Sequence, residues 1–176
     1  MSSIIPTPGA KRASHDVVVV GCGNLLRGDD GAGPECVRLL GESGLPTGVI
    51  AIDAGTSGAD VVLCMRRANR VILVDACQSG RPPGSLLRLS AADLAEISPT
   101  GPLNVHAFRW IDAVRLTRAL AGEQPAATVS AWLVEGADFA PGSGLSPPVA
   151  AAVSQLAAEI RAALEPAGRR AIVAGD

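Results

Sequence analysis

The chain has 176 residues, of which 48% are apolar and only 2% aromatic, and its formal net charge is −2. This length suits one domain with a sizeable core and is too short for two. The small net charge gives no electrostatic case for nucleic acid or an anionic membrane as a partner, so protein or small-molecule partners are expected. No apolar run approaches the roughly 20 residues that span a bilayer, and the N-terminal residues lack the apolar segment of a signal peptide. The sequence therefore predicts a cytoplasmic protein.

Four cysteines lie in segments that the sequence predicts to be structured, and no two of them form a CxxC pair. That spacing favours buried free thiols over a zinc knuckle or a disulfide framework. The four are Cys22, Cys36, Cys64 and Cys77.

Strand-like and helix-like segments alternate along the first half of the chain. Strands are predicted over residues 16–20 and 49–53, and the helical spacing of small and apolar residues over 31–40 between them completes a βαβ unit. A second helix is predicted over residues 59–67. The nearly continuous apolar run RVILVDA at residues 70–76 is typical of a central parallel strand that is covered on both faces.

The alternation continues in the second half. Residues 84–89 predict a further strand, and Ser90 with Asp93 matches a capping box that opens a short helix. A long helix is predicted over residues 106–121, and a last strand over residues 128–134.

The final helix is predicted to begin at Ser146, an N-cap followed by two prolines, and to end near Leu164. Residues 15–165 then form a single α/β domain between flexible tails at 1–14 and 166–176.

This order of elements predicts an α/β three-layer sandwich: a mostly parallel, twisted sheet of about five strands with helices on both faces. In such folds the site lies at the carboxyl ends of the strands, near the point where the strand order reverses. Each predicted strand end there carries an acid followed or preceded by small residues. These segments are GCGNLLRGDDG from Gly21, DAGTSG from Asp53, DACQSG from Asp75 and VEG from Val134.

The stretch GCGNLLRGDDGAG from Gly21 has the glycines of a phosphate-binding loop without its pattern. Leu26 stands where a dinucleotide fingerprint needs its third glycine, and no Gly-Lys-Ser/Thr follows. Asp29 and Asp30 sit where a phosphate would lie, and two carboxylates would repel it. The loop is better suited to a cation.

Each of the acids also has a structural alternative. Asp29 is predicted to cap the helix that follows it, a contribution of about 1 kcal/mol. An ionised Asp75 at the end of a buried strand is costly unless it is paired, hydrogen-bonded or bound to a metal, although an Asx-type turn that closes the strand stays open. Asp53 is either a turn former or a site residue.

The sequence contains only two histidines, His15 and His106. His15 falls in the predicted N-terminal tail. His106 opens the long helix, where the helix dipole favours a neutral imidazole that can bind metal, although a purely structural role stays open. With Asp30 and Asp75 it makes a set suited to Zn, Ni, Mn or Fe, with room left for water or substrate. A mechanism in which the two carboxylates share one proton also stays open.

Taken in order along residues 16–165, these motifs resemble the hydrogenase maturation endopeptidases. The resemblance rests on GCGNLL and DDGAG in the first loop, DAGTSG at Asp53, VDA at Val74, the single His106, VEG at Val134 and GLSPPV at Gly144.

The resemblance implies a cytoplasmic, monomeric endopeptidase that removes the C-terminal extension of a nickel-containing hydrogenase large-subunit precursor after nickel insertion. In that family the metal-contacting acids follow the first and third strands and a histidine opens a later helix, which matches Asp30, Asp75 and His106 here. The family has Glu or Asp at position 30. Nickel is expected to be supplied by the precursor, and another divalent metal can occupy the isolated site. Asp75 is the predicted base.

Two other functions compete with this interpretation. A nonproteolytic nickel-sensing maturation chaperone would use the same ligands without cleaving the precursor. A nucleotide-binding flavodoxin-like domain is disfavoured by the acidic loop. Asn24, Asp53 and Glu135 are further residues that could shape the site.

Overall fold

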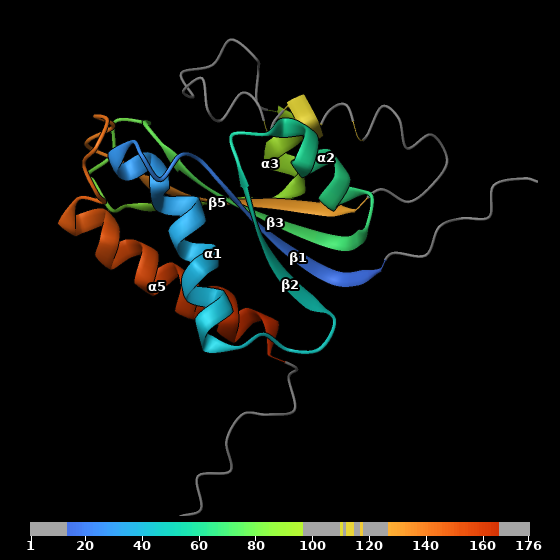
Figure 1. The fold of residues 1–176 in the computed structure, drawn as a ribbon. Coiled ribbons are helices and arrows are strands. Elements are labelled where there is room, and N and C mark those ends of the chain that lie inside the picture. Colours follow the sequence, from blue (N-terminus) through green and yellow to red (C-terminus); the bar gives the residue numbers. More distant parts are fainter. Residues whose placement is uncertain (1–13, 97–109, 111, 115–116, 118–126, 166–176) are drawn as a thin grey trace, which may run out of the picture.

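The computed structural model describes residues 14–96, 110, 112–114, 117 and 127–165 (Figure 1). In this part of the chain, strands alternate with helices as predicted. The strands are β1 (His15–Cys22), β2 (Val49–Gly55), β3 (Ala68–Cys77), β4 (Leu86–Leu89) and β5 (Thr128–Glu135). The helices are the 3-10 helix η1 (Gly28–Gly31), α1 (Ala32–Ser43), α2 (Gly58–Met65), α3 (Ala91–Glu96) and α5 (Pro147–Leu164).

The described strands form one sheet with the order β2-β1-β3-β5-β4. The four strands β2, β1, β3 and β5 run parallel to one another, and β4 is antiparallel to β5 at the edge of the sheet. The chain first steps outward from β1 to β2 and then crosses back over β1 to β3. The strand order therefore reverses between β1 and β3, and a site is expected where these two strands end.

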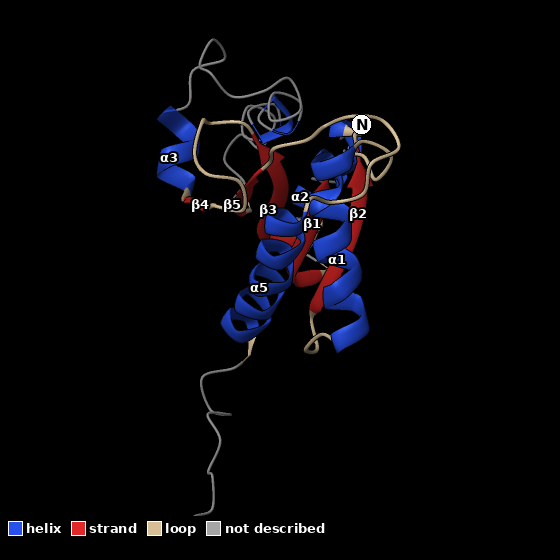
Figure 2. Cartoon of the chain, turned by 90° about the vertical axis from the view of Figure 1, so that its left-hand side faces the viewer, coloured by secondary structure: helices blue, strands red, loops and turns tan. Residues whose placement is uncertain are grey.

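Helices cover both faces of the sheet (Figures 1 and 2). α1 and α5 lie side by side on one face, where they bury Val19, Ile72 and Val134. α2, α3 and Trp110 cover the other face and bury residues such as Val18 and Leu73. The consecutive valines of β1 thus serve two cores. This arrangement confirms the predicted three-layer α/β sandwich and its mostly parallel sheet.

Helix α1 lies unusually close to the sheet because two glycines face each other. A Cβ at Gly33 would lie 2.2 Å from the carbonyl oxygen of Cys22 and 2.4 Å from that of Val74. A Cβ at Gly21 would lie 2.4 Å from the carbonyl oxygen of Gly33. Since backbone atoms cannot move aside cheaply, the glycine-rich motif is needed for this helix–strand contact, independently of any ligand.

The substitution Gly33→Ala is therefore expected to lower the free energy of unfolding by about 1–3 kcal/mol, as overpacking of a core does. Urea unfolding followed by circular dichroism measures this change. Gly41→Ala in the same helix is the matched control, because a Cβ there meets nothing within 4 Å. Alanine favours helix over glycine by up to about 1 kcal/mol, so the control should be at least as stable as the unmodified protein. Equal effects of the two changes would contradict this account of Gly33.

Several predicted boundaries are confirmed, and two details differ. Ser90 and Asp93 make the reciprocal hydrogen bonds of a capping box ahead of α3. Ser146 is the N-cap of α5, which ends at Leu164 as predicted. The predicted helix over 31–40 is preceded by the 3-10 turn η1, and His15, expected in the tail, is the first residue of β1.

The remaining sequence predictions fall largely outside the described residues. Within the predicted helix 106–121, residues 110, 112–114 and 117 are described and helical. The tail predictions for 1–14 and 166–176 concern residues of which only Ser14 is described. None of the helices that the structure describes is both long enough and apolar enough to cross a membrane.

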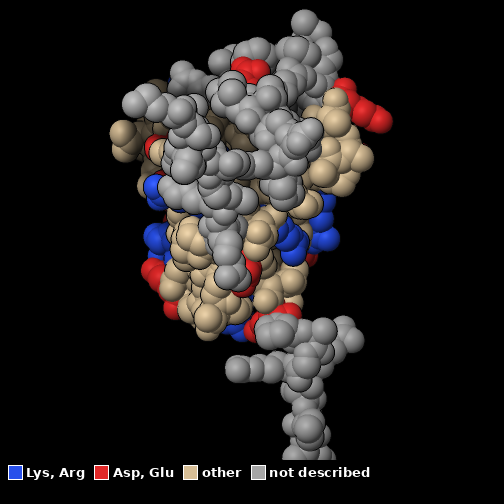
Figure 3. Space-filling model, turned by 90° about the vertical axis from the view of Figure 1, so that its right-hand side faces the viewer, with Lys and Arg blue, Asp and Glu red and all other residues tan. Residues whose placement is uncertain are grey.

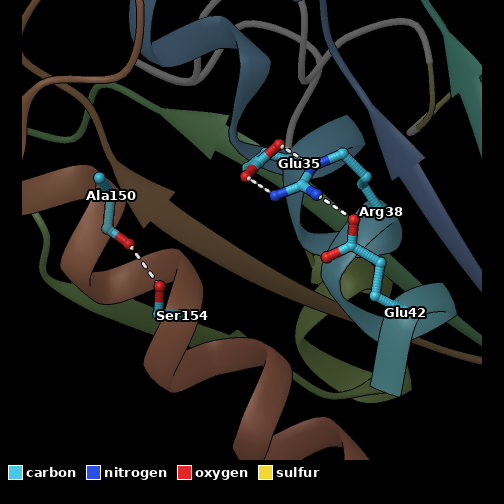
Figure 4. A network of polar contacts seen from close by, with 5 residues as sticks. All are labelled: Glu35, Arg38, Glu42, Ala150 and Ser154. Carbon is cyan, nitrogen blue, oxygen red and sulfur yellow. Dashed lines mark hydrogen bonds and ion pairs between the residues drawn. The ribbon is translucent and has the colours of Figure 1, made fainter. Parts of the chain in front are cut away.

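The exposed side of α1 carries an ion-pair network in which Arg38 bridges Glu35 and Glu42 (Figure 4). Such exposed pairs contribute little to stability. On the face drawn in Figure 3, basic and acidic side chains of the described residues lie among uncharged ones, and neither sign forms a continuous patch. None of the residues Glu35, Arg38 and Glu42 lines a hollow at the strand ends, so Arg38 is a suitable position for control variants.

Candidate active site

The loop after β1 folds back on itself and brings Asp30 to the end of the sheet. Gly23 has a φ of +125°, and a Cβ there would lie 1.9 Å from the carbonyl oxygen of Asp30. That carbonyl accepts a hydrogen bond from the backbone N–H of Asn24 at 3.1 Å. The Asn24 side chain accepts one from the Leu26 N–H at 2.9 Å, which fixes the tip of the loop. Asn24 thus shapes the loop, and the Asp30 side chain is buried.

Asp75 lies inside β3, at the strand-order reversal, and only 1% of it is exposed. Its Oδ1 accepts a hydrogen bond from the Ala76 N–H at 2.8 Å, and its Oδ2 has no hydrogen-bond partner among the described residues. The alternative of an Asx-type turn that closes the strand is wrong, because β3 continues to Cys77 and Asp75 pairs with Leu133 of β5. Nothing in the strand geometry requires a carboxylate at this position.

The charge of Asp30 acts on the carboxyl group of Asp75. Burial raises the pKa of Asp75 to about 8, the Ala76 N–H opposes the rise, the charge of Asp30 adds to it, and the Trp110 indole lowers it. Two carboxyl groups of one site that disfavour each other's ionisation are typical of a catalytic or cation-binding centre. The structure thus brings the two predicted acids together, and their roles as ligands or catalysts stay predictions.

Two hollows lie at the strand ends, and Asp75 lines the smaller one. Asp75 and Trp110 line a small pocket together with Gly23, Gly55 and Thr56. The same Gly23, Gly55 and Thr56 also line a groove of about 330 Å³. The pocket and the groove therefore adjoin, and an extended segment in the groove would lie next to the pocket that Asp75 lines.

The side chain of Asp29 does not cap its own helix, so that prediction is wrong. Its carboxylate accepts hydrogen bonds from the N–H groups of Ala137, Asp138 and Ser146 at 2.8, 2.9 and 2.6 Å, and one from the Ser146 hydroxyl at 2.9 Å. Burial alone would raise the pKa of Asp29, but these hydrogen bonds hold it below its usual range. Asp29 ties the first loop to the loop after β5 and to the start of α5.

Asp29→Asn is accordingly expected to destabilise the fold by about 2 kcal/mol, since it removes charge-assisted hydrogen bonds and turns one acceptor oxygen into a donor that faces other donors. Urea unfolding at neutral pH is the measurement. Asp93→Asn is the control: this exposed carboxylate accepts the capping-box hydrogen bonds, and its loss should cost no more than about 1 kcal/mol. A smaller loss of stability for Asp29→Asn than for Asp93→Asn would contradict this role of Asp29.

Glu135 has a related structural role. Its carboxylate accepts hydrogen bonds from the N–H groups of Ser79 and Gly80 and from the Ser79 hydroxyl, and it contacts the Cys77 thiol at 3.3 Å. Burial opposes its ionisation, yet these donors lower its pKa overall. Glu135 orders the loop after β3, directly downstream of Asp75.

The Asp53 side chain accepts a hydrogen bond from the Gly55 N–H at 2.8 Å, as a turn former does, and Asp53 also lines the groove. All four cysteines are buried free thiols, as predicted. Burial raises the pKa of Cys77 to about 12, so its thiol is protonated and inert.

The third predicted ligand, His106, lies outside the described residues, and the structure does not test it. Among the residues that are described, no group of three His, Cys, Asp or Glu side chains is placed to hold a metal ion. Trp110, which sequence reasoning did not single out, is 1% exposed and lines the Asp75 pocket. Its position four residues after His106 in a predicted helix, one turn further on, was the available signal.

Comparisons with known proteins agree with this geometry. The family described as hydrogenase maturation protease, HycI, matches residues 34–163. The hydrogenase expression/formation protein HoxM of Azotobacter vinelandii is 32% identical over 162 residues, which cover 90% of this chain and 75% of that protein. A Methanocaldococcus jannaschii relative is 40% identical over 84 residues, and that match spans 47% of this chain and 54% of the relative.

Among solved structures, the hydrogenase maturating endopeptidase HybD from E. coli superimposes with a TM-score of 0.70 at 28% identity. That match covers 85% of this chain and 91% of HybD. Family, relatives and fold leave the flavodoxin-like alternative without support. The chain belongs to the hydrogenase maturation protease family.

Proposed function

We propose that this chain is an endopeptidase that removes the C-terminal extension of a nickel-containing hydrogenase large-subunit precursor once nickel has been inserted. Asp30 and Asp75 contact the bound nickel, with His106 as a third ligand. The observation that carries the proposal is the buried pair Asp30 and Asp75 in a chain that belongs to a protease family, with Asp75 lining a pocket that adjoins a groove. The reaction takes place in the cytoplasm, and the chain acts as a monomer.

The buried acid pair supplies a physical basis for recognising nickel. Two carboxylates that share a dry site are destabilised by each other and by burial. A precursor that presents a divalent cation offsets this cost, whereas an empty precursor does not. Each difference of about 1.4 kcal/mol in binding free energy gives a tenfold preference for the loaded precursor. The metal is a part of the substrate, and another divalent metal can occupy the isolated site.

Hydrolysis needs a base and a polarised carbonyl. Asp75, in its ionised form, takes a proton from a water molecule as the water oxygen adds to the scissile carbonyl carbon. The same proton then passes to the amide nitrogen as the C–N bond breaks, which leaves a new carboxyl terminus and a free amine. A divalent metal near the carbonyl supplies Lewis-acid polarisation. Asp30, whose charge helps to raise the pKa of Asp75, positions the cation rather than the water.

The test is the intact mass of the precursor after incubation with this chain. Nickel-loaded precursor is expected to lose a C-terminal peptide, and nickel-free precursor is expected to keep its full mass. A loaded precursor that forms a stable complex at unchanged mass would instead establish the nonproteolytic nickel-sensing chaperone, which uses the same two acids.

A further inference from the structure

The pocket that holds Asp75 is lined on another side by the start of helix α2. Gly55, Thr56, Ser57 and Gly58 at the β2–α2 junction line it together with Asp75. The N-terminus of a helix carries partial positive charge and backbone N–H groups without intrahelical acceptors. A carboxylate and a helix N-terminus therefore meet at one pocket.

Two N–H groups at this junction have acceptors, whereas the Gly58 N–H has none within the described ranges of the chain. The Gly55 N–H donates to the Asp53 carboxylate at 2.8 Å, and the Ser57 N–H donates to the Ala54 carbonyl at 3.0 Å. Gly58 is the first residue of α2, so its N–H has no acceptor within the helix. No residue that the structure describes accepts a hydrogen bond from it.

A second, independent feature indicates a ligand in the same pocket. Asp75 is 1% exposed, and its Oδ2 has no hydrogen-bond partner in the described part of the chain. Buried polar atoms are rarely left unsatisfied in a native protein unless a ligand or water completes them. This pocket has a volume of about 10 Å³, which suits one water molecule against Asp75. A carbonyl group that enters from the adjoining groove would accept from the Gly58 N–H, and the water would donate to Asp75.

We infer that the backbone N–H of Gly58 is an oxyanion donor of the proposed peptidase. This inference rests on the proposed function. As water adds to the scissile carbonyl carbon, the electron pair of the C=O bond moves to the oxygen, and the water proton moves to Asp75. The Gly58 N–H donates to that negatively charged oxygen, and the α2 dipole adds to the stabilisation. When the C–N bond breaks, the pair returns to form C=O and the proton passes from Asp75 to the leaving amine.

The substitution Gly58→Pro removes this one N–H and suits its position. Proline is favoured as the first residue of a helix and is tolerated elsewhere in the first turn, as at Pro147 and Pro148 of α5. The residue before a first proline is normally extended. Ser57 has a φ of −90° and a ψ of 101°, so it already meets that requirement. Removal of one oxyanion donor is expected to lower kcat about 100-fold or more with KM unchanged, because the donor acts only in the transition state.

Ala59→Pro is the matched control. It places the same ring one residue later in the same helical turn, at an exposed position that does not line the pocket. Both kcat and KM of this control should equal those of the unmodified protein. Thermal unfolding of both variants shows whether the ring alone disturbs α2.

The measurement is cleavage of nickel-loaded precursor at several precursor concentrations. An unchanged kcat for folded Gly58→Pro would overturn the inference while the unmodified protein still cleaves, so the proposed function would stand. An equal loss in Ala59→Pro would also overturn it. If Gly58→Pro does not fold, glycolic acid in place of Gly58 replaces the N–H by an ester oxygen without a ring, and its unchanged kcat would be equally decisive. A precursor left intact by the unmodified protein would reject the proposed function and this inference together.

Discussion

The variant Asp75→Asn is expected to lose precursor cleavage by at least about 100-fold, because a positioned general base contributes 10²–10⁴-fold to such reactions. The amide oxygen of asparagine can still accept the Ala76 N–H hydrogen bond that Asp75 Oδ1 accepts. Its NH₂ group replaces Oδ2, the buried atom proposed to take the proton, which makes no hydrogen bond among the described residues. The variant should therefore fold normally and lose only its ability to cleave the precursor.

The assay is the intact mass of nickel-loaded precursor sampled over time. Arg38→Ala is the control, because Arg38 lies on the exposed side of α1 and pairs only with exposed or partly exposed acids; this variant should cleave at the unmodified rate. Full cleavage by Asp75→Asn with its nickel preference intact would remove Asp75 from both proposed roles.

The strands were predictable because a strand that is buried on both faces has a run of consecutive apolar residues. β3 reads RVILVDA since helices cover both faces of the sheet, and β1 reads VVVV for the same reason. Asp75 stood out from this background, since a carboxylate inside such a run has a cost that needs an explanation. The acid most exceptional for its surroundings in the sequence is also the one with the strongly raised pKa in the structure.

The role of Asp29 could not be predicted from local sequence. Its hydrogen-bond partners Ala137 and Ser146 lie 108 and 117 positions away along the chain, and no periodic pattern encodes that contact. Helix capping was the locally reasonable prediction, but tertiary contacts decided the outcome. The same limit applies to Gly58, which lines one pocket with Asp75 although the two residues are far apart in the sequence.

The stability of the isolated protein is expected to fall as the pH rises toward 8, and Asp75→Asn should largely remove this trend. The folded-state pKa of Asp75 is about 8, against 3.8 as its ordinary value. Between these two values the native state keeps a proton that the unfolded chain releases, so the free energy of unfolding decreases with increasing pH. Each unit of pKa difference corresponds to about 1.4 kcal/mol, so a change of a few kcal/mol is expected.

The measurement is urea unfolding without added metal at several pH values from about 5 to about 9, which bracket the titration of a carboxyl group with a raised pKa. The stability of Asp75→Asn relative to the unmodified protein should rise from about pH 5 to about pH 8 and then level off, because Asp75 titrates near pH 8 and an amide does not titrate. Gly41→Ala introduces no ionisable group, and its stability difference should be independent of pH. A constant difference for Asp75→Asn as well would mean that Asp75 is ionised throughout this range. The buried acid pair would then have no electrostatic cost that a metal-loaded precursor could offset.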